Sequence, residues 1–141
     1  MERECVFCRI ARREEDAYVV WEDDVSIAFL DLRPLFPGHT LLIPRTHHET
    51  LTDLPAELTA PLFGGARLLA RAMEEGLDAQ GSFVAINNRV SQSIPHLHIH
   101  IVPRRRKDGL KGFFWPRQRY EGREAIIEVQ DRLRAAVQRL T

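Results

Sequence analysis

The sequence lacks any long run of apolar residues. No stretch of its 141 residues approaches the roughly 18 consecutive apolar residues that a membrane-spanning helix needs. The opening residues MERECVF do not show the basic and then apolar order of a signal peptide. Low-complexity segments and repeats of fixed period are also lacking, which argues against a solenoid or a disordered chain. We therefore expect a soluble cytoplasmic protein without a membrane partner, folded as a single domain over residues 1–141.

Cysteine is scarce, since only Cys5 and Cys8 occur. Two cysteines so close together exclude a disulfide framework, and 44% hydrophobic residues are enough for a core without disulfides. In a reducing compartment a CxxC pair favours metal binding or redox chemistry over a structural disulfide. Nothing around this pair resembles a thioredoxin-like unit, so metal binding is preferred, with two buried reduced cysteines as the alternative.

The chain also lacks net charge, but the charges are unevenly distributed. The segment from Pro103 to Tyr120 contains seven basic residues and one acid, a charge of +6 that leaves −6 for the rest. The basic residues are Arg104, Arg105, Arg106, Lys107, Lys111, Arg117 and Arg119. A local positive field beside a cleft attracts phosphates, whereas a uniformly basic surface would indicate nucleic-acid binding more generally.

Periodicity and turn signals predict strands followed by a helix, twice. Strands are expected at 18–21, 26–30, 40–43, 82–86 and 97–102, with the last two paired as neighbours. Helical spacing predicts a helix from about 55 to 75, capped by Thr52 or Asp53 and ended by Gly76, and a terminal helix at about 121–140. The short connections favour an α+β fold with an antiparallel sheet. We expect a core at about 5–103 and a basic aromatic loop at 104–120.

The segment HLHIHI places His96, His98 and His100 on alternate residues, with aliphatic residues at 97, 99 and 101 between them. On a strand, this alternation puts three imidazoles on one face and the aliphatic residues on the other. A neutral imidazole can attack phosphorus, and neighbouring imidazoles can stabilise the phosphoryl oxygens. The alternatives are a solvated polar face and a three-histidine zinc site that activates water.

The segment SQSIPHLHIHIVPR resembles the signature of the histidine triad superfamily. CVFC near the start and AFLDLRPLFPGHTLLIPRTH in the middle extend the resemblance over roughly the first hundred residues, to the zinc-containing bacterial branch. This resemblance implies a five-stranded antiparallel sheet with two main helices, doubled by a two-fold dimer. It also implies that His98 is the nucleophile that forms a covalent nucleotidyl-histidine, while His100 and His39 bind the phosphate.

Further residues receive roles from the same resemblance. Gln92 and Ser93 match the polar pair that contacts the phosphates or assists the leaving group. Asp31 matches the residue that hydrogen-bonds the ribose hydroxyls, as a carboxylate can. Phe29 and Leu30 would form a wall for the base, or alternatively belong to the core. The loop NNRVSQS is shorter than in many relatives, and Asn87 or Asn88 would reach a phosphate or leaving group.

The resemblance also implies a structural Zn²⁺ held by Cys5, Cys8, His47 and His96, with His48 as an alternative to His47. Four protein ligands close such a site to water, so the phosphoryl-transfer step itself would need no metal.

The predicted activity is hydrolysis or transfer at the α-phosphate of nucleoside 5'-phosphoryl compounds. Dinucleoside polyphosphates such as diadenosine tetraphosphate, or nucleoside phosphoramidates, are the expected substrates. A uridylyltransferase-like activity is less favoured, because that branch replaces the third histidine. The alternative outside enzymes is a regulatory module that binds nucleotide, or nucleic acid through the basic loop, where Phe113, Phe114 or Trp115 would stack on a base or complete the dimer.

Overall fold

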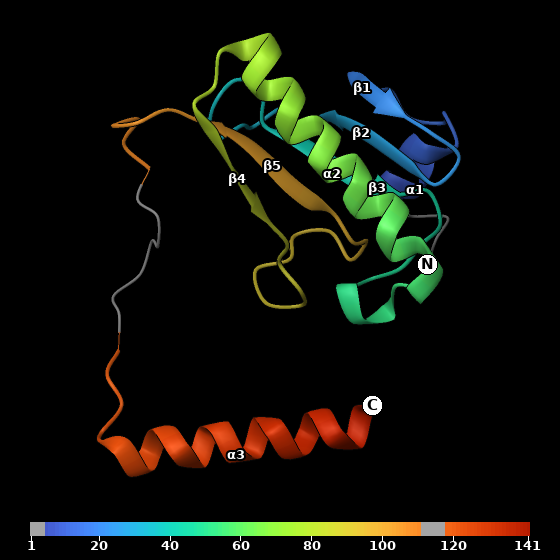
Figure 1. Ribbon diagram of the computed structural model, residues 1–141. Helices are drawn as coiled ribbons and strands as arrows, with labels where there is room; N and C mark the ends of the chain where they lie inside the picture. Colours follow the sequence, from blue (N-terminus) through green and yellow to red (C-terminus); the bar gives the residue numbers. More distant parts are fainter. Residues whose placement is uncertain (1–4, 111–117) are drawn as a thin grey trace. The chain divides into compact units, whose positions relative to one another are not determined.

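The structure, a computed structural model, describes residues 5–110 and 118–141. The chain divides into two compact units, Met1–Asp108 and Gly109–Thr141, and the first contains the whole sheet (Figure 1). The single domain expected over 1–141 stays a prediction. In the described part, no helix has the length and apolar character needed to cross a membrane.

The first unit contains a five-stranded sheet and three helical segments. Its strands are β1 (Val19–Glu22), β2 (Ser26–Leu30), β3 (Thr40–Pro44), β4 (Gly81–Ala85) and β5 (Ile99–Arg104). Its helices are α1 (Val6–Ala11), the 3-10 turn η2 (Leu51–Asp53) and α2 (Ala56–Leu77). The strand order is β1-β2-β3-β5-β4 and every pairing is antiparallel, which confirms the predicted α+β class.

The sheet separates two hydrophobic clusters. On one face, α2 packs over the sheet with Leu42, Leu97, Ile99 and Ile101 at the centre of the cluster (Figure 1). The other cluster joins α1 to β2 and β3 through Phe7, Ile10, Ile27, Phe29, Leu41 and Ile43. Since side chains alternate along a strand, the histidines of the HLHIHI segment lie on the α1 face.

Helix α2 is longer than predicted and has different caps. Its N-cap is Pro55, because Thr50 and Asp53 already form a capping box for η2, in which Asp53 Oδ2 accepts from the Thr50 backbone N at 3.1 Å. The C-cap is Asp78 in the left-handed conformation with φ of 54°, two residues beyond the predicted stop at Gly76. Both glycines in the helix centre are accommodated, and Gly65 lies against the ring of Trp21 from β1.

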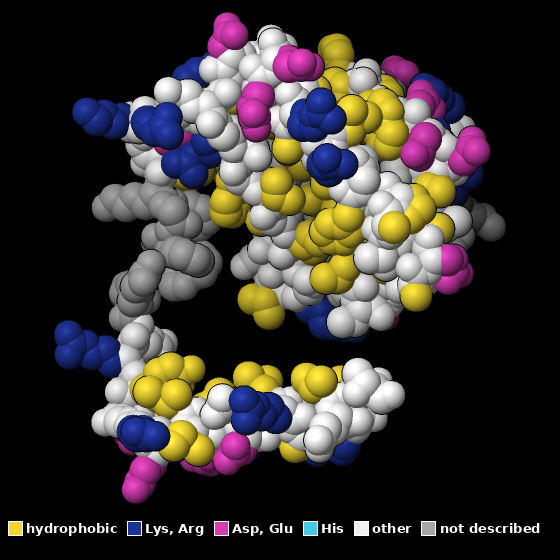
Figure 2. Space-filling model, in the orientation of Figure 1, with side chains coloured by type: hydrophobic (Ala, Val, Ile, Leu, Met, Phe, Trp, Pro, Cys, Tyr) yellow, Lys and Arg dark blue, Asp and Glu magenta, His cyan; other side chains and the backbone are white. Residues whose placement is uncertain are grey.

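The second unit contains α3 (Arg123–Leu140), close to the predicted terminal helix. Its hydrophobic residues Ile126, Ile127, Val129, Leu133, Val137 and Leu140 are all exposed, and Figure 2 shows such side chains along it. Hydrophobic side chains are also visible on the face of the first unit that carries α2 (Figure 2). The expected two-fold dimer stays a prediction, because the structure describes one chain.

Candidate active site and metal centre

The three histidines of the triad share one face, but only His100 lies in a strand. β5 begins at Ile99, two residues later than predicted, so His96 and His98 lie in the segment that leads into it. The intervening Leu97 and Ile99 are fully buried in the cluster under α2, which anchors the segment and turns the imidazoles to the other side. The predicted alternation therefore continues beyond the hydrogen-bonded strand.

His98 is held in one orientation and one tautomer. Its Nδ1 lies 2.7 Å from the carbonyl oxygen of His96, which can only accept, so Nδ1 carries the proton and Nε2 has the lone pair. The Phe7 ring meets the imidazole edge to face at 5.2 Å between ring centroids. Burial lowers the pKa of His98 below 6.5, although the His96 carbonyl and Asp31 oppose this shift. At neutral pH, His98 is therefore an uncharged base with an available Nε2.

A second pair of imidazoles, His39 and His100, lies beside His98. The backbone N–H of Leu35 donates to His39 Nδ1 at 3.0 Å, so the proton of neutral His39 is on Nε2. That Nε2 lies 3.0 Å from His100 Nδ1 and donates to it, which leaves the proton of His100 on its own Nε2. A chain of donors thus runs from the Leu35 backbone through both rings.

The environment keeps this pair neutral. Burial lowers the pKa of His100 to about 4, assisted by His98 and His39. Burial also lowers the pKa of His39, while the carboxylate of Asp31, whose Oδ2 lies 3.7 Å from His39 Nε2, raises it. Asp31, His39 and His100 place their ligand-type atoms within 4.8 Å of one another. However, the backbone donor on His39 Nδ1 puts hydrogen on Nε2 and opposes metal ligation there.

A pocket of about 730 Å³ opens beside these histidines. Of the residues predicted to bind substrate or act on it, Phe29, Leu30, Asp31, Ser93, His98 and His100 line it. Phe29 also belongs to the core, at 4% exposure, so its two predicted roles are compatible. Sequence reasoning did not find the α1 side of the pocket, formed by Val6, Phe7 and Ile10, because a six-residue helix is too short for a periodic signal.

The polar loop before the triad is tied to backbone groups. Gln92 Nε2 donates to the Glu49 carbonyl at 2.6 Å, and its Oε1 accepts from the Arg89 backbone N–H at 2.8 Å. Asn88 Oδ1 accepts from the Leu51 backbone N–H at 2.8 Å. Gln92, Asn87 and Asn88 do not line the pocket in this conformation, whereas Ser93 does. Phosphate or leaving-group contacts by these three residues remain predictions.

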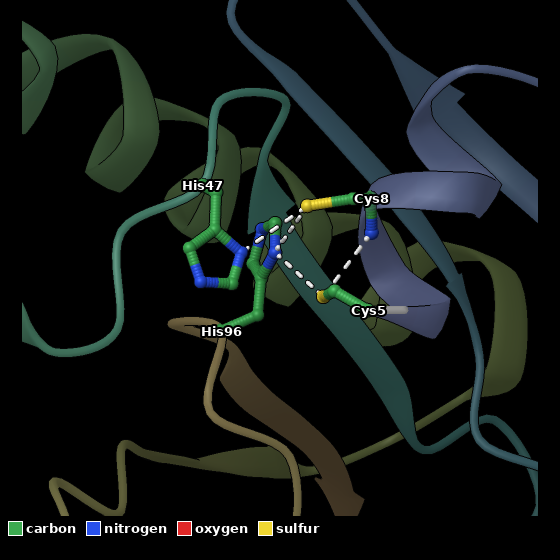
Figure 3. Close-up of side chains that lie close together, drawn as sticks. All are labelled: Cys5, Cys8, His47 and His96. Atoms are coloured by element: carbon green, nitrogen blue, oxygen red, sulfur yellow. Dashed lines mark hydrogen bonds between the residues drawn. The ribbon is translucent and has the colours of Figure 1, made fainter. Parts of the chain in front are cut away.

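The four residues predicted as metal ligands, Cys5, Cys8, His47 and His96, lie together and bring their ligand-type atoms within 4.8 Å of one another (Figure 3). Cys8 Sγ lies 3.2 Å from His47 Nδ1, and His96 Nδ1 lies 3.4 Å from Cys5 Sγ and 3.5 Å from Cys8 Sγ. Nitrogen and sulfur ligands of tetrahedral zinc, at about 2.0 and 2.3 Å from the metal, are about 3.5 Å apart. The spacing and the donor set therefore fit Zn²⁺.

The hydrogen bonds around these four residues also fit a zinc site. His96 Nε2 donates to the Pro44 carbonyl at 2.9 Å, which leaves Nδ1 as the ligand atom, as a metal-bound histidine requires. His48 is not a member of the cluster, because its Nε2 bonds Thr46 Oγ1 at 2.8 Å. The structure thus favours His47 over His48.

The described start of the basic segment is not part of the pocket lining. β5 runs away from His98, and Arg104 at its far end pairs with Asp108, with 2.7 Å between Nε and Oδ2. Arg105 donates to the Leu77 carbonyl at the end of α2. Lys111, Phe113, Phe114, Trp115 and Arg117 lie outside the described residues, so their predicted contacts with a substrate are untested.

Comparison with known proteins agrees with this geometry. The HIT domain family model matches residues 12–107. The chain is 35% identical over 112 residues to adenylylsulfatase HINT3 of Arabidopsis thaliana, a match that covers 78% of this chain and 57% of that longer protein. It is 36% identical over 115 residues to adenosine 5'-monophosphoramidase HNT1 of Saccharomyces cerevisiae, covering 81% of this chain and 71% of that protein.

Comparison with solved structures also finds proteins of the histidine triad family. A Zn-bound histidine triad family protein from Mycobacterium smegmatis is 37% identical, with a TM-score of 0.74 and coverage of 93% of this chain and 99% of that one. A member of the HIT family from Bacillus subtilis has a TM-score of 0.85 at 32% identity, with coverage of 94% and 96%. The sequence motif, the fold and these similarities agree, and the chain belongs to the histidine triad (HIT) family.

Proposed function

We propose that the protein hydrolyses or transfers nucleoside 5'-phosphoryl groups at the α-phosphate, with His98 as the nucleophile. The observation that carries this proposal is the 2.7 Å hydrogen bond from His98 Nδ1 to the His96 carbonyl. It fixes the lone pair on Nε2, and His98 lines the pocket. The similarity to an adenylylsulfatase and to an adenosine 5'-monophosphoramidase supports a nucleotide hydrolase in general terms.

In the first step, the lone pair of His98 Nε2 attacks the α-phosphorus and forms a P–N bond. The bond from phosphorus to the leaving group breaks, and the leaving group takes its electron pair and, when it is the amine of a phosphoramidate, a proton from solvent. The ring becomes a substituted imidazolium whose charge is stabilised by the hydrogen bond from Nδ1 to the His96 carbonyl. Water then attacks phosphorus and breaks the P–N bond. A nucleoside 5'-monophosphate and neutral His98 result, and the proton lost by the water goes to solvent.

The neighbouring groups have roles that follow from their hydrogen bonds. His100 carries its proton on Nε2, through the chain from Leu35 and His39, and so can donate to a phosphoryl oxygen as charge develops. Ser93 lines the pocket and can donate a second hydrogen bond to phosphate or leaving group. Asp31 accepts from the Arg33 backbone N–H through Oδ1 at 2.9 Å, which leaves Oδ2 for the ribose hydroxyls.

The metal has a structural role in this proposal. Zn²⁺ would be held by Cys5, Cys8, His47 and His96, where it would brace the segment that carries His98 and supply no chemistry to the phosphoryl transfer. The His96 carbonyl that fixes His98 belongs to a residue of the metal centre. The tautomer of His39 opposes a second metal in the pocket.

The test compares wild type with His98→Ala on adenosine 5'-phosphoramidate and diadenosine tetraphosphate, with a chelator present. We expect wild type to release nucleoside monophosphate and His98→Ala to lose at least about a thousandfold in turnover while still binding AMP. Release of nucleoside monophosphate by both proteins would refute the assignment of His98 as the nucleophile. Nucleotide binding without release by either protein would instead support a regulatory binding module.

A further inference from the structure

The pocket runs across the sheet from the histidines toward β1. Register pairs Val19 with Phe29, Phe29 with Leu41 and Leu41 with His100, so these four residues form one row on the α1 face. Neighbouring strands are about 4.8 Å apart, which makes the row roughly 14 Å long. His98 and His100 line one end, and residues 15–18, which lead into β1, line the other. A nucleoside monophosphate is long enough to span this distance.

The far end of the pocket is acidic. Among the described residues that line the pocket, the charged groups are the carboxylates of Glu15, Asp16 and Asp31, and there is no lysine or arginine. Asp31 lies near His39. Glu15 is 3.8 Å from Arg9, whereas Asp16 has no ion pair or hydrogen bond within the described chain. The end distant from the histidines therefore offers hydrogen-bond acceptors and repels anions.

This charge pattern determines which part of a substrate can occupy each end. In the proposed function, the phosphate binds near His98 and His100 and the ribose near Asp31. A base attached to that ribose would lie against the apolar wall of Phe7, Ile10 and Phe29, with its outer edge toward residues 15 and 16, which line the same pocket. A polyphosphate tail cannot occupy that end, because carboxylates would oppose it.

The bases differ in what they offer to a carboxylate. The Watson–Crick edge of guanine presents two neighbouring donors, N1–H and the 2-amino group, which match the two oxygens of one carboxylate. Adenine presents one donor beside the N1 acceptor, whose lone pair opposes a carboxylate. Hypoxanthine keeps the N1–H but lacks the 2-amino group. Hydrogen-bond acceptors at this position should therefore bind guanine most tightly, hypoxanthine less tightly and adenine least tightly.

We propose that Asp16, with Glu15 beside it, makes this pocket selective for guanine nucleotides. The inference rests on the proposed function, since it assumes that phosphate binds at the histidines. Hydrogen bonds to charged groups contribute most when buried, and both carboxylates are exposed at the rim. We therefore expect a preference of about tenfold for guanine over adenine, at the low end of the range for such bonds.

The test is equilibrium binding of GMP, IMP and AMP to wild type, Asp16→Asn and Glu14→Gln by calorimetry. Glu14 is the matched control, because it is an exposed carboxylate two residues away that bonds Arg12 and does not line the pocket. We expect Asp16→Asn to weaken GMP binding about tenfold and to bind AMP at least as tightly as wild type, because the amide no longer opposes the adenine N1 lone pair. The preference for GMP should be unchanged in Glu14→Gln. AMP binding as tight as GMP binding, or an unchanged preference in Asp16→Asn, would overturn the inference.

Turnover separates this inference from the proposed function. The leaving group is held constant by comparing kcat/KM for guanosine and adenosine 5'-phosphoramidates. Selective GMP binding that depends on Asp16, without turnover of either compound, would support the guanine inference and refute the proposed activity. Equal turnover of both compounds by wild type and by Asp16→Asn would support the proposed activity and refute the guanine inference.

Discussion

Two adjacent glycines in α2 provide a sharp test of the packing between helix and sheet. A Cβ built on Gly65 would lie 2.8 Å from Cζ3 of Trp21 and 3.3 Å from Cδ2 of Leu42. A Cβ on Gly64, one residue earlier, would meet nothing within 4 Å. Gly64→Ala and Gly65→Ala therefore make the same chemical change in the same helix, once toward open space and once into the core.

The two variants are expected to differ in their free energy of unfolding. Replacing glycine by alanine inside a helix stabilises it by about 1 kcal/mol, and this gain applies to both variants. Gly65→Ala must also displace the Trp21 ring or fully buried Leu42, and overpacking of this kind costs about 1–3 kcal/mol. We expect Gly64→Ala to be stabilised by about 1 kcal/mol, and Gly65→Ala to range from unchanged to destabilised by about 2 kcal/mol.

Urea denaturation followed by circular dichroism measures this difference directly. With an m-value of about 2 kcal/mol/M, a difference of about 2 kcal/mol between the variants separates their midpoints by about 1 M. The m-values should agree, which shows that the unfolded states are comparable. Equal stabilisation of both variants would refute the close packing of Gly65 against Trp21.

Two further predictions concern the metal and the pH dependence. Cys8→Ser should lose bound zinc and unfold at lower temperature, whereas His48→Ala should keep about one zinc per chain. Metal analysis after dialysis checks both, and loss of zinc from His48→Ala as well as from Cys8→Ser would contradict the choice of His47 over His48. The pKa of His100 falls to about 4 on folding, so the unfolded chain takes up this proton first and stability should decrease as the pH falls from 6.5 to about 4. His100→Asn should reduce this slope in urea titrations, and an unchanged slope would contradict the burial of a neutral ring.

Much of the fold could be predicted because its signals are local. Alternation in HLHIHI predicts that imidazoles and aliphatic side chains lie on opposite sides, and this holds although only His100 lies in a strand. The five strands fall within two residues of their predicted bounds. The CxxC spacing is also a local signal, and it predicts that Cys5 and Cys8 bind a metal. Local signals also gave an error: Thr52 or Asp53 is the N-cap that the sequence predicts for the long helix, but Asp53 belongs to the capping box of η2, whose N-cap is Thr50. The local sequence does not distinguish between these two adjacent turns.

From the sequence alone, local patterns specify the order of the strands along the chain and the common face of the three histidines. The tertiary structure was needed to bring α1 against β2 and β3, Phe7 against the His98 ring, and His47 Nδ1 within 3.2 Å of Cys8 Sγ. It also revealed the acidic far end of the pocket at Glu15 and Asp16. These features depend on contacts between side chains that are distant in sequence. Such contacts are set by the packing of the whole core, and no periodic pattern in the sequence indicates them.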